Sequence, residues 1–180
     1  MQPSRHSVRP LILLILWALA LAAAFAVDRG IAEWVQQTGP IDKHAVFVKI
    51  IKLPGYFPFT ACIAILLGLF HRRRWGAALA LVLSAASVGG LYSVMKWVAG
   101  RHRPVKGIAP FAFHPFIRGV PGLWREPGLC FPSGHASLSF ATAMCLALLL
   151  PRWRWGFFLV ALLTCAERVL ENAHYLSDVV

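Results

Sequence analysis

The sequence has 180 residues, of which 58% are hydrophobic and only 14% are charged. Soluble domains carry about 25% charged residues, so this composition excludes an ordinary soluble domain and favours a membrane protein. The net charge of +11 would suggest a nucleic-acid partner in a soluble protein. Here the basic residues gather between apolar blocks, as in cytoplasmic loops of membrane proteins, so we expect a membrane partner and no nucleic acid. The chain shows no repeat or linker, which predicts a single domain over residues 1–180.

The first apolar block, Leu11 to Val27, follows a basic start. The small residues Ala24 and Ala26 resemble the cleavage site of a secretory signal peptide. However, seventeen unbroken apolar residues exceed the usual apolar region of a signal peptide and reach the lower limit for spanning a bilayer. We therefore predict a retained first span.

Two more apolar blocks follow. The second, Leu53 to Phe70, tolerates Pro54 and Pro58 because prolines near a helix start cost few hydrogen bonds. The third, Gly76 to Met95, is long enough for a full span. Three arginines, 72–74, separate the two blocks, which predicts a short cytoplasmic loop.

Residues 97–133 interleave prolines and glycines with basic residues, so they cannot form a membrane helix. We predict an extramembrane active-site loop over 97–133. Alternation of the spans places this loop and residues 28–44 on the periplasmic or extracellular side, opposite a cytoplasmic N-terminus. The loop is basic although the rule places fewer basic residues there, and anion binding would explain the exception. The expected location is the bacterial inner membrane.

A fourth block, Ala136 to Leu150, and a fifth, from about Trp155 to Ala166, complete the apolar pattern. We therefore predict an all-α, polytopic transmembrane helix bundle with five spans and the start of a sixth. A sixth span needs about seventeen more residues than follow Asp178, so we expect a chain that is truncated at its C-terminus. Without them, His174 and Asp178 would be poorly held at a frayed end.

Polar residues concentrate in three short stretches at the ends of these blocks, where ionisable groups point to function. The first reads KWVAGRHRP, and its Lys96 and Arg103 are seven residues apart, near one face if the helix persists. The second is PSGH, in which Ser133 can cap the fourth helix and free backbone N–H groups can bind an anion.

The third stretch contains Arg168, His174 and Asp178. On a helix, His174 and Asp178 are close enough for the carboxylate to hold the imidazole in one tautomer, ready to attack as a nucleophile. The histidines and cysteines show no zinc-binding spacing, so we predict no metal.

Together these stretches resemble the type 2 phosphatidic acid phosphatase family, whose motifs are K-x6-R-P, P-S-G-H and S-R-x5-H-x3-D. All three occur in order, and the resemblance covers roughly residues 45 to 180. Glu167 stands where the family usually has serine, so one phosphate hydrogen bond differs. The resemblance implies a six-helix membrane fold and an enzyme without a cofactor or metal.

The resemblance also implies roles for individual residues. His174 would attack phosphorus, Asp178 would stabilise its imidazolium, and His135 would protonate the departing oxygen before water hydrolyses the phosphohistidine. The phosphate oxygens would be held by a group of cations and helix N-terminal residues: Lys96, Arg103, Ser133, Gly134 and Arg168.

The implied function is a membrane phosphatase acting on a phosphorylated lipid: phosphatidate, phosphatidylglycerol phosphate, a polyprenyl diphosphate or a lipid A phosphate. The residues do not choose among these, nor do they give an oligomeric state. Two alternatives stay open. One is a vanadate-dependent haloperoxidase, which uses the same cage, and the other is a non-catalytic membrane subunit that binds anionic lipid.

Other residues have a structural interpretation beside a functional one. Lys96 and Arg103, taken singly, could anchor a helix at the membrane interface. A solvated loop face or substrate contact explains the remaining basic loop residues: His102, Lys106, His114, Arg118 and Arg125. Packing onto the bilayer interface, or contact with a lipid chain, explains the loop aromatics: Phe111, Phe113, Phe116, Trp124 and Phe131.

Overall fold

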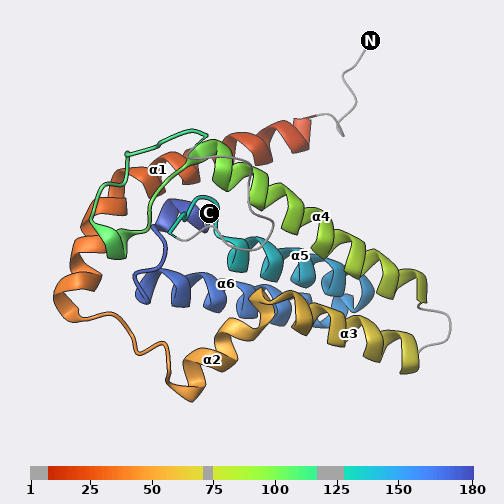
Figure 1. Cartoon of the computed structure of the whole chain (residues 1–180). Helices are drawn as coiled ribbons and strands as arrows, with labels where there is room; N and C mark the ends of the chain where they lie inside the picture. Colours follow the sequence, from red (N-terminus) through yellow and green to blue (C-terminus); the bar gives the residue numbers. More distant parts are fainter. Residues whose placement is uncertain (1–7, 71–74, 117–127) are drawn as a thin grey trace, which may run out of the picture.

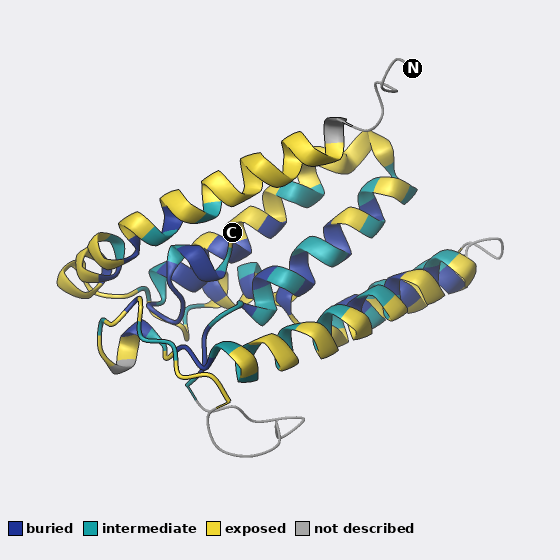
Figure 2. Ribbon diagram, turned by 90° about the horizontal axis from the view of Figure 1, so that it is seen from above, coloured by how far each residue is buried: buried dark blue, intermediate teal, exposed yellow. Residues whose placement is uncertain are grey.

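The computed structural model describes residues 8–70, 75–116 and 128–180, and the regular elements within these ranges are helical (Figure 1). The arginine triplet therefore lies outside the described residues. The longest helix, α1, spans Val8–Thr38. It runs past the predicted end at Val27 without a break, so the more polar residues up to Thr38 are also helical. Most of α1 is exposed in Figure 2, as expected for an apolar helix that meets lipid.

The second apolar block is bent and begins earlier than predicted. Helix α2 (Val46–Lys52) leads into the 3-10 turn η1 (Leu53–Gly55), and α3 (Phe57–Phe70) follows at an angle of 70°. Pro54 lies in the first turn of η1, where the missing N–H of a proline costs few backbone hydrogen bonds. The bend brings η1 into contact with α5.

The remaining helices form the packed part of the bundle. Helix α4 spans Trp75–Ala99, α5 spans Gly134–Leu149, and α6 spans Arg154–Leu170 after the 3-10 turn η4 (Pro151–Trp153). Two further 3-10 turns are η3 (Pro104–Lys106) and η5 (Leu176–Asp178). Helix α5 packs against both α4 and α6, and α3 packs against α4 (Figure 1).

Small and polar side chains let these helices approach closely. Ala64 of α3 and Ala78 of α4 are buried together with Leu81. The hydroxyls of Thr60 and Thr142 are 2.8 Å apart and join α3 to α5. Such small residues and interhelical hydrogen bonds are typical of contacts between membrane helices.

The all-α prediction and the membrane class are confirmed. Among the described helices, α1 and α4 are long and apolar enough to cross a bilayer, and the bent pair of α2 and α3 provides a third candidate span. Helices α5 and α6 have 16 and 17 residues. The C-terminal ends of α4 and α6 and the N-terminal end of α5 lie at the same end of the bundle (Figure 1), which brings the three polar stretches together.

Candidate active site

His174 and Asp178 follow α6 and do not lie on an α-helix, contrary to the prediction. Helix α6 ends at Leu170, and Asn172 adopts the left-handed conformation with φ 56°, which asparagine tolerates better than most residues. The chain then turns into η5. Nδ1 of His174 lies 3.4 Å from Oδ2 of Asp178, so a turn, rather than a helix, pairs them.

The pair is firmly held, contrary to the expectation of a frayed end. His174 is 3% exposed and Asp178 is 4% exposed. The backbone N–H of Tyr175 donates to Oδ2 of Asp178 over 2.8 Å, and the Tyr175 hydroxyl accepts the N–H of Ala109 over 3.0 Å. Contacts with the loop and with Arg101 thus fix the turn.

The second polar stretch caps α5 as predicted. The Ser133 hydroxyl accepts from the backbone N–H of Ala136, 3.5 Å away. The backbone N–H of Ser133 donates to the carbonyl oxygen of Asp178 over 2.8 Å. This bond connects the second stretch directly to the third, and it occupies the Ser133 N–H in the structure.

His135 is placed by η1. Its ring packs edge-on against Tyr56, with ring centroids 4.6 Å apart. Gly55 lies so close that a β-carbon there would be 2.7 Å from the β-carbon of His135. Only glycine permits this approach. The bend before α3 therefore sets the position of the predicted general acid.

Lys96 and Arg103 do not share a helix face, contrary to the prediction, because α4 ends at Ala99. Gly100 turns the chain with φ 61°. Arg103 is then held against the end of the loop. Its backbone N–H donates to Gly128 over 3.0 Å, and its Nε donates to the carbonyl of Leu129 over 3.4 Å.

The predicted cations influence the pKa values of His174 and of one another. Burial lowers the pKa of His174 to about 4, the positive charges of Lys96 and Arg168 contribute to this lowering, and Asp178 opposes it. Burial and the charge of Arg168 likewise lower the pKa of Arg103. The imidazole is therefore neutral at neutral pH, and two cations, Lys96 and Arg168, lie close enough to act on its charge, while Arg103 interacts with Arg168.

Arg168 also belongs to an ion cluster that sequence reasoning missed in part. Its Nη2 lies 2.6 Å from Glu171, and its Nη1 lies 3.6 Å from Glu167. Lys52, from the end of α2, lies 2.7 Å from Glu171 and 3.2 Å from Glu167. Glu167, at the family's serine position, is thus part of this cluster. Lys52 could have been identified from the sequence, because an ionisable residue directly beside an apolar block indicates a functional or structural role.

Four buried nitrogen atoms near His174 lack a hydrogen-bond partner among the described residues: Nε of Arg101, Nε2 of His135, Nε of Arg168 and Nδ1 of His174. Buried polar atoms are normally paired. Because this set includes Arg101, which lies outside the predicted phosphate-binding residues, it does not by itself mark a binding site.

A second buried ion cluster, which we call the Arg101 cluster, consists of Asp28, Arg101, Ser177 and Asp178. Arg101 pairs with both aspartates, and all three charged side chains are almost fully buried. Sequence reasoning assigned no role to Arg101, Asp28 or Ser177. Asp28 directly follows the first apolar block, where an ionisable residue indicates function.

The described part of the loop packs onto the helices. Phe113 and Phe131 lie with their ring centroids 6.2 Å from that of Phe25 in α1, and Phe116 lies 4.8 Å from Trp97 in α4. Phe111 also lies 6.2 Å from Phe25, and the rings of His102 and His114 are 5.8 Å apart. Of the loop residues considered from the sequence, Arg118, Trp124 and Arg125 lie outside the described residues, and the side chain of Lys106 is not described.

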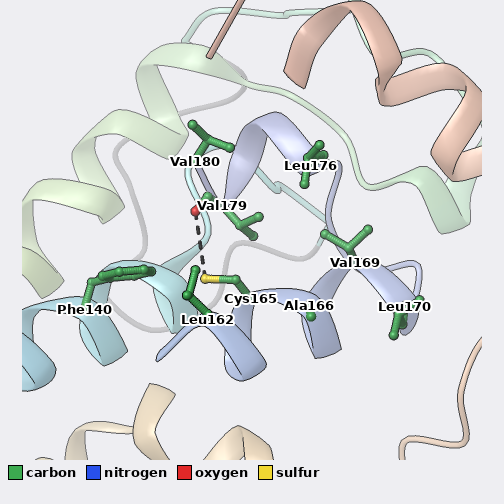
Figure 3. A pocket seen from close by; sticks show the side chains of 9 residues that line it. All are labelled: Phe140, Leu162, Cys165, Ala166, Val169, Leu170, Leu176, Val179 and Val180. Carbon is green, nitrogen blue, oxygen red and sulfur yellow. Dashed lines mark hydrogen bonds between the residues drawn. The ribbon is translucent and has the colours of Figure 1, made fainter. Parts of the chain in front are cut away.

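An apolar pocket of about 600 Å³ lies between α5, α6 and η5 (Figure 3). Phe140, Leu162 and Leu176 are among its lining side chains, and the Cys165 thiol in its wall points to the carbonyl of Val179, 3.8 Å away. The pocket contains no phosphate-binding side chain. Within the described ranges, no three His, Cys, Asp or Glu side chains are grouped to hold a metal ion.

Comparison with known proteins identifies relatives of this chain. Two lipid A 1-phosphatases, from Rhizobium johnstonii and Rhizobium etli, are 33% identical over 99 residues and 35% identical over 94 residues. Each match covers 51% of this chain, but only 36% and 38% of the relative, so the chain spans little more than a third of their length.

A solved structure has the same fold. The transmembrane PAP2 type phosphatidylglycerolphosphate phosphatase of Bacillus subtilis superposes with a TM-score of 0.64 over 93% of this chain and 86% of that chain, at 23% identity. The sequence profile of the PAP2 superfamily matches residues 77–180, which contain all three polar stretches. The chain therefore belongs to the PAP2 superfamily.

Proposed function

We propose that this protein is a metal-independent lipid phosphatase that transfers a phosphoryl group to His174 and then to water. The observation that carries the proposal is the buried His174, 3.4 Å from Asp178, next to a capped helix N-terminus and a set of cations. A neutral imidazole in such a setting is an activated nucleophile.

In the first step, Nε2 of His174 attacks phosphorus while the bond to the lipid oxygen breaks. Asp178 stabilises the imidazolium that forms at Nδ1. His135 donates a proton to the leaving oxygen, and the negative charge of the bound phosphate favours its protonated form. In the second step, His135 takes a proton from water, whose oxygen attacks the phosphohistidine and releases His174 and inorganic phosphate.

The phosphate is stabilised by charge, which is where phosphoryl-transfer catalysis mainly acts. Lys96, Arg103 and Arg168 neutralise the equatorial oxygens. The N-terminus of α5 at Gly134 adds backbone N–H groups and the positive end of the helix dipole.

The substrate is a lipid because the site lies at the end of the membrane helices, where a headgroup would be. We propose that α5 and α6 also cross the membrane, giving five spans with a cytoplasmic N-terminus and the site and the 97–133 loop on the outer side. Among the candidate lipids, the two Rhizobium relatives favour a lipid A phosphate.

The test is phosphate release in detergent, with EDTA present, from lipid A, phosphatidate, phosphatidylglycerol phosphate and a polyprenyl diphosphate. The wild type is compared with His174→Ala and with His44→Ala, which removes an exposed histidine. Loss of the nucleophile should lower kcat by roughly 10⁴-fold or more, whereas His44→Ala should retain activity. Equal activity of His174→Ala would refute the mechanism, and release from none of the four lipids would refute the lipid substrate.

A further inference from the structure

Arg101 is a buried cation outside the phosphate-binding motifs. Its side chain is 0% exposed, and its guanidinium divides between two carboxylates. Nη2 donates to Oδ2 of Asp28 over 2.7 Å, while Nη1 donates to Oδ1 of Asp178 and to the Ser177 hydroxyl. A buried charge is costly unless it is paired and hydrogen-bonded, and the planar arginine fork suits two carboxylates well.

Asp28 holds the other end of this arrangement. From the middle of α1, it accepts the Ser177 backbone N–H at Oδ1 over 2.9 Å and the Ser177 hydroxyl at Oδ2. With the bond from Arg101, the carboxylate accepts three donors and is 0% exposed. Asp28 therefore fixes both Arg101 and the backbone of η5.

Aromatic rings close the Arg101 cluster. The guanidinium lies 4.2 Å from the ring centroid of Tyr175, 5.1 Å from that of Phe25 and 5.3 Å from that of Phe113. These rings attract the cation and displace water, which strengthens the ion pairs within the cluster. Contacts from α1, the loop and the segment of Tyr175 and η5 therefore hold the guanidinium of Arg101, of which only Nε has no hydrogen-bond partner among the described residues.

The Arg101 cluster includes Asp178, the partner of His174. Oδ1 of Asp178 is taken by Arg101, and Oδ2 accepts the Tyr175 N–H and faces Nδ1 of His174. The carboxylate cannot rotate without breaking these contacts. In addition, the negative charge of Asp28 offsets the positive charge of Arg101. The negative charge of Asp178 therefore remains available to the imidazolium of His174.

We propose that Asp28 and Arg101 are positioning residues for the nucleophile: they hold Asp178, and through it the imidazole of His174, so that α1 completes the active site. Asp28 lies outside residues 77–180, which match the superfamily profile. The inference rests on the proposed function, because it takes His174 to be the nucleophile.

The decisive variant is Asp28→Asn, which leaves the Arg101–Asp178 pair balanced in charge. Its matched control is Glu33→Gln, the same change of acid to amide in an exposed pair with Arg29 on the same helix. We expect Asp28→Asn to lower kcat by roughly 10- to 100-fold, as misplacement of a reacting group does. The competitive inhibition constant of inorganic phosphate should stay within roughly twofold, because the phosphate-binding cations are untouched.

A purely structural role would give a different result. It would lower the thermal stability of Asp28→Asn while leaving kcat per folded molecule unchanged, and this result would overturn the proposal. Equal loss of kcat and of phosphate affinity would overturn it as well. If Asp28→Asn does not fold, Ser177→Ala removes two hydrogen bonds without unpairing a charge, and it should lower kcat by a few fold with unchanged phosphate inhibition.

A spectroscopic measurement keeps the two proposals separate. The ¹⁵N signals of the His174 ring, assigned by comparison with His174→Ala, should shift in Asp28→Asn and stay in place in Glu33→Gln. This experiment needs no turnover. Unchanged signals in Asp28→Asn would overturn the positioning role even if the wild type is an active phosphatase, whereas full activity of His174→Ala would overturn the proposed function instead.

Discussion

The two buried ion clusters beside His174 differ in their balance of charge and in the elements that they join. In the Arg101 cluster, one cation is divided between two carboxylates, and each carboxylate also accepts bonds from η5. In the cluster of Arg168 and Lys52, two cations meet two carboxylates, Glu167 and Glu171, and connect α2 to the end of α6. In both clusters the buried Nε of the arginine has no partner among the described residues. Because only the Arg101 cluster contains Asp178, we infer that it holds His174 in place, whereas the other cluster contains Arg168, a cation of the phosphate site that we propose.

The largest effect is expected at Arg168, which belongs both to the cluster with Lys52 and to the proposed phosphate site. Arg168→Lys removes the planar fork that pairs with Glu171 and that we propose binds phosphate, so it should lower kcat/KM by roughly 100- to 1,000-fold and weaken phosphate inhibition. Arg154→Lys, at the exposed start of the same helix, is the matched control and should be nearly silent. Equal effects of the two substitutions would contradict a ligand-binding role for Arg168.

Lys52 tests the structural part of the same cluster. Lys52→Gln leaves Glu167 and Glu171 without their second cation, and removal of one partner of a buried pair should destabilise the fold by roughly 3 kcal/mol. The melting temperature in detergent should fall, whereas Lys49→Gln, an exposed change on the same helix, should leave it unchanged. An unchanged melting temperature of Lys52→Gln would show that Arg168 and its carboxylates do not depend on α2.

The smallest effect near neutral pH concerns protonation of His174, whose partner Asp178 belongs to the Arg101 cluster. Burial lowers its pKa to about 4 in the folded state, below the ordinary value of 6.5. Between these values the unfolded chain binds more protons. Stability from this group is therefore complete above pH 6.5 and is lost as the pH falls towards 4, by at most about 1.4 kcal/mol per pH unit.

The direct check of this protonation state is an NMR titration of the His174 ring between pH 5.5 and 8. Its signals should not move, and His174→Ala gives the assignment. A midpoint near 6.5 would show that the imidazole is not buried as the structure has it.

Much of the fold follows from the sequence because apolar blocks and proline positions are local signals. The blocks predicted the cores of α1, α3, α4, α5 and α6, and Ser133 was correctly placed as a helix cap. Helix ends were less accurate: α1 continues past Val27, and α4 stops before Arg103, so the inferred helix face does not exist.

The site was predictable only as far as its motifs reach. His174 and Asp178 were correctly paired, but through a turn that depends on Asn172 rather than through a helix. The partners Asp28 and Arg101 were missed because they lie 73 positions apart in the chain, and Ser177 lies 149 positions from Asp28. Pairing over such distances is set by helix packing and leaves no periodic signal in one sequence.

The most direct test of the central claim is to trap the intermediate. The wild type is mixed with phosphorylated lipid, quenched within the first turnover, digested under alkaline conditions that preserve phosphohistidine, and analysed by mass spectrometry. The account predicts a phosphate on His174 that is lost in His174→Ala, with less of it formed in Asp28→Asn per unit time. Turnover by the wild type without a phosphate on His174, or with the phosphate on another residue, would contradict it.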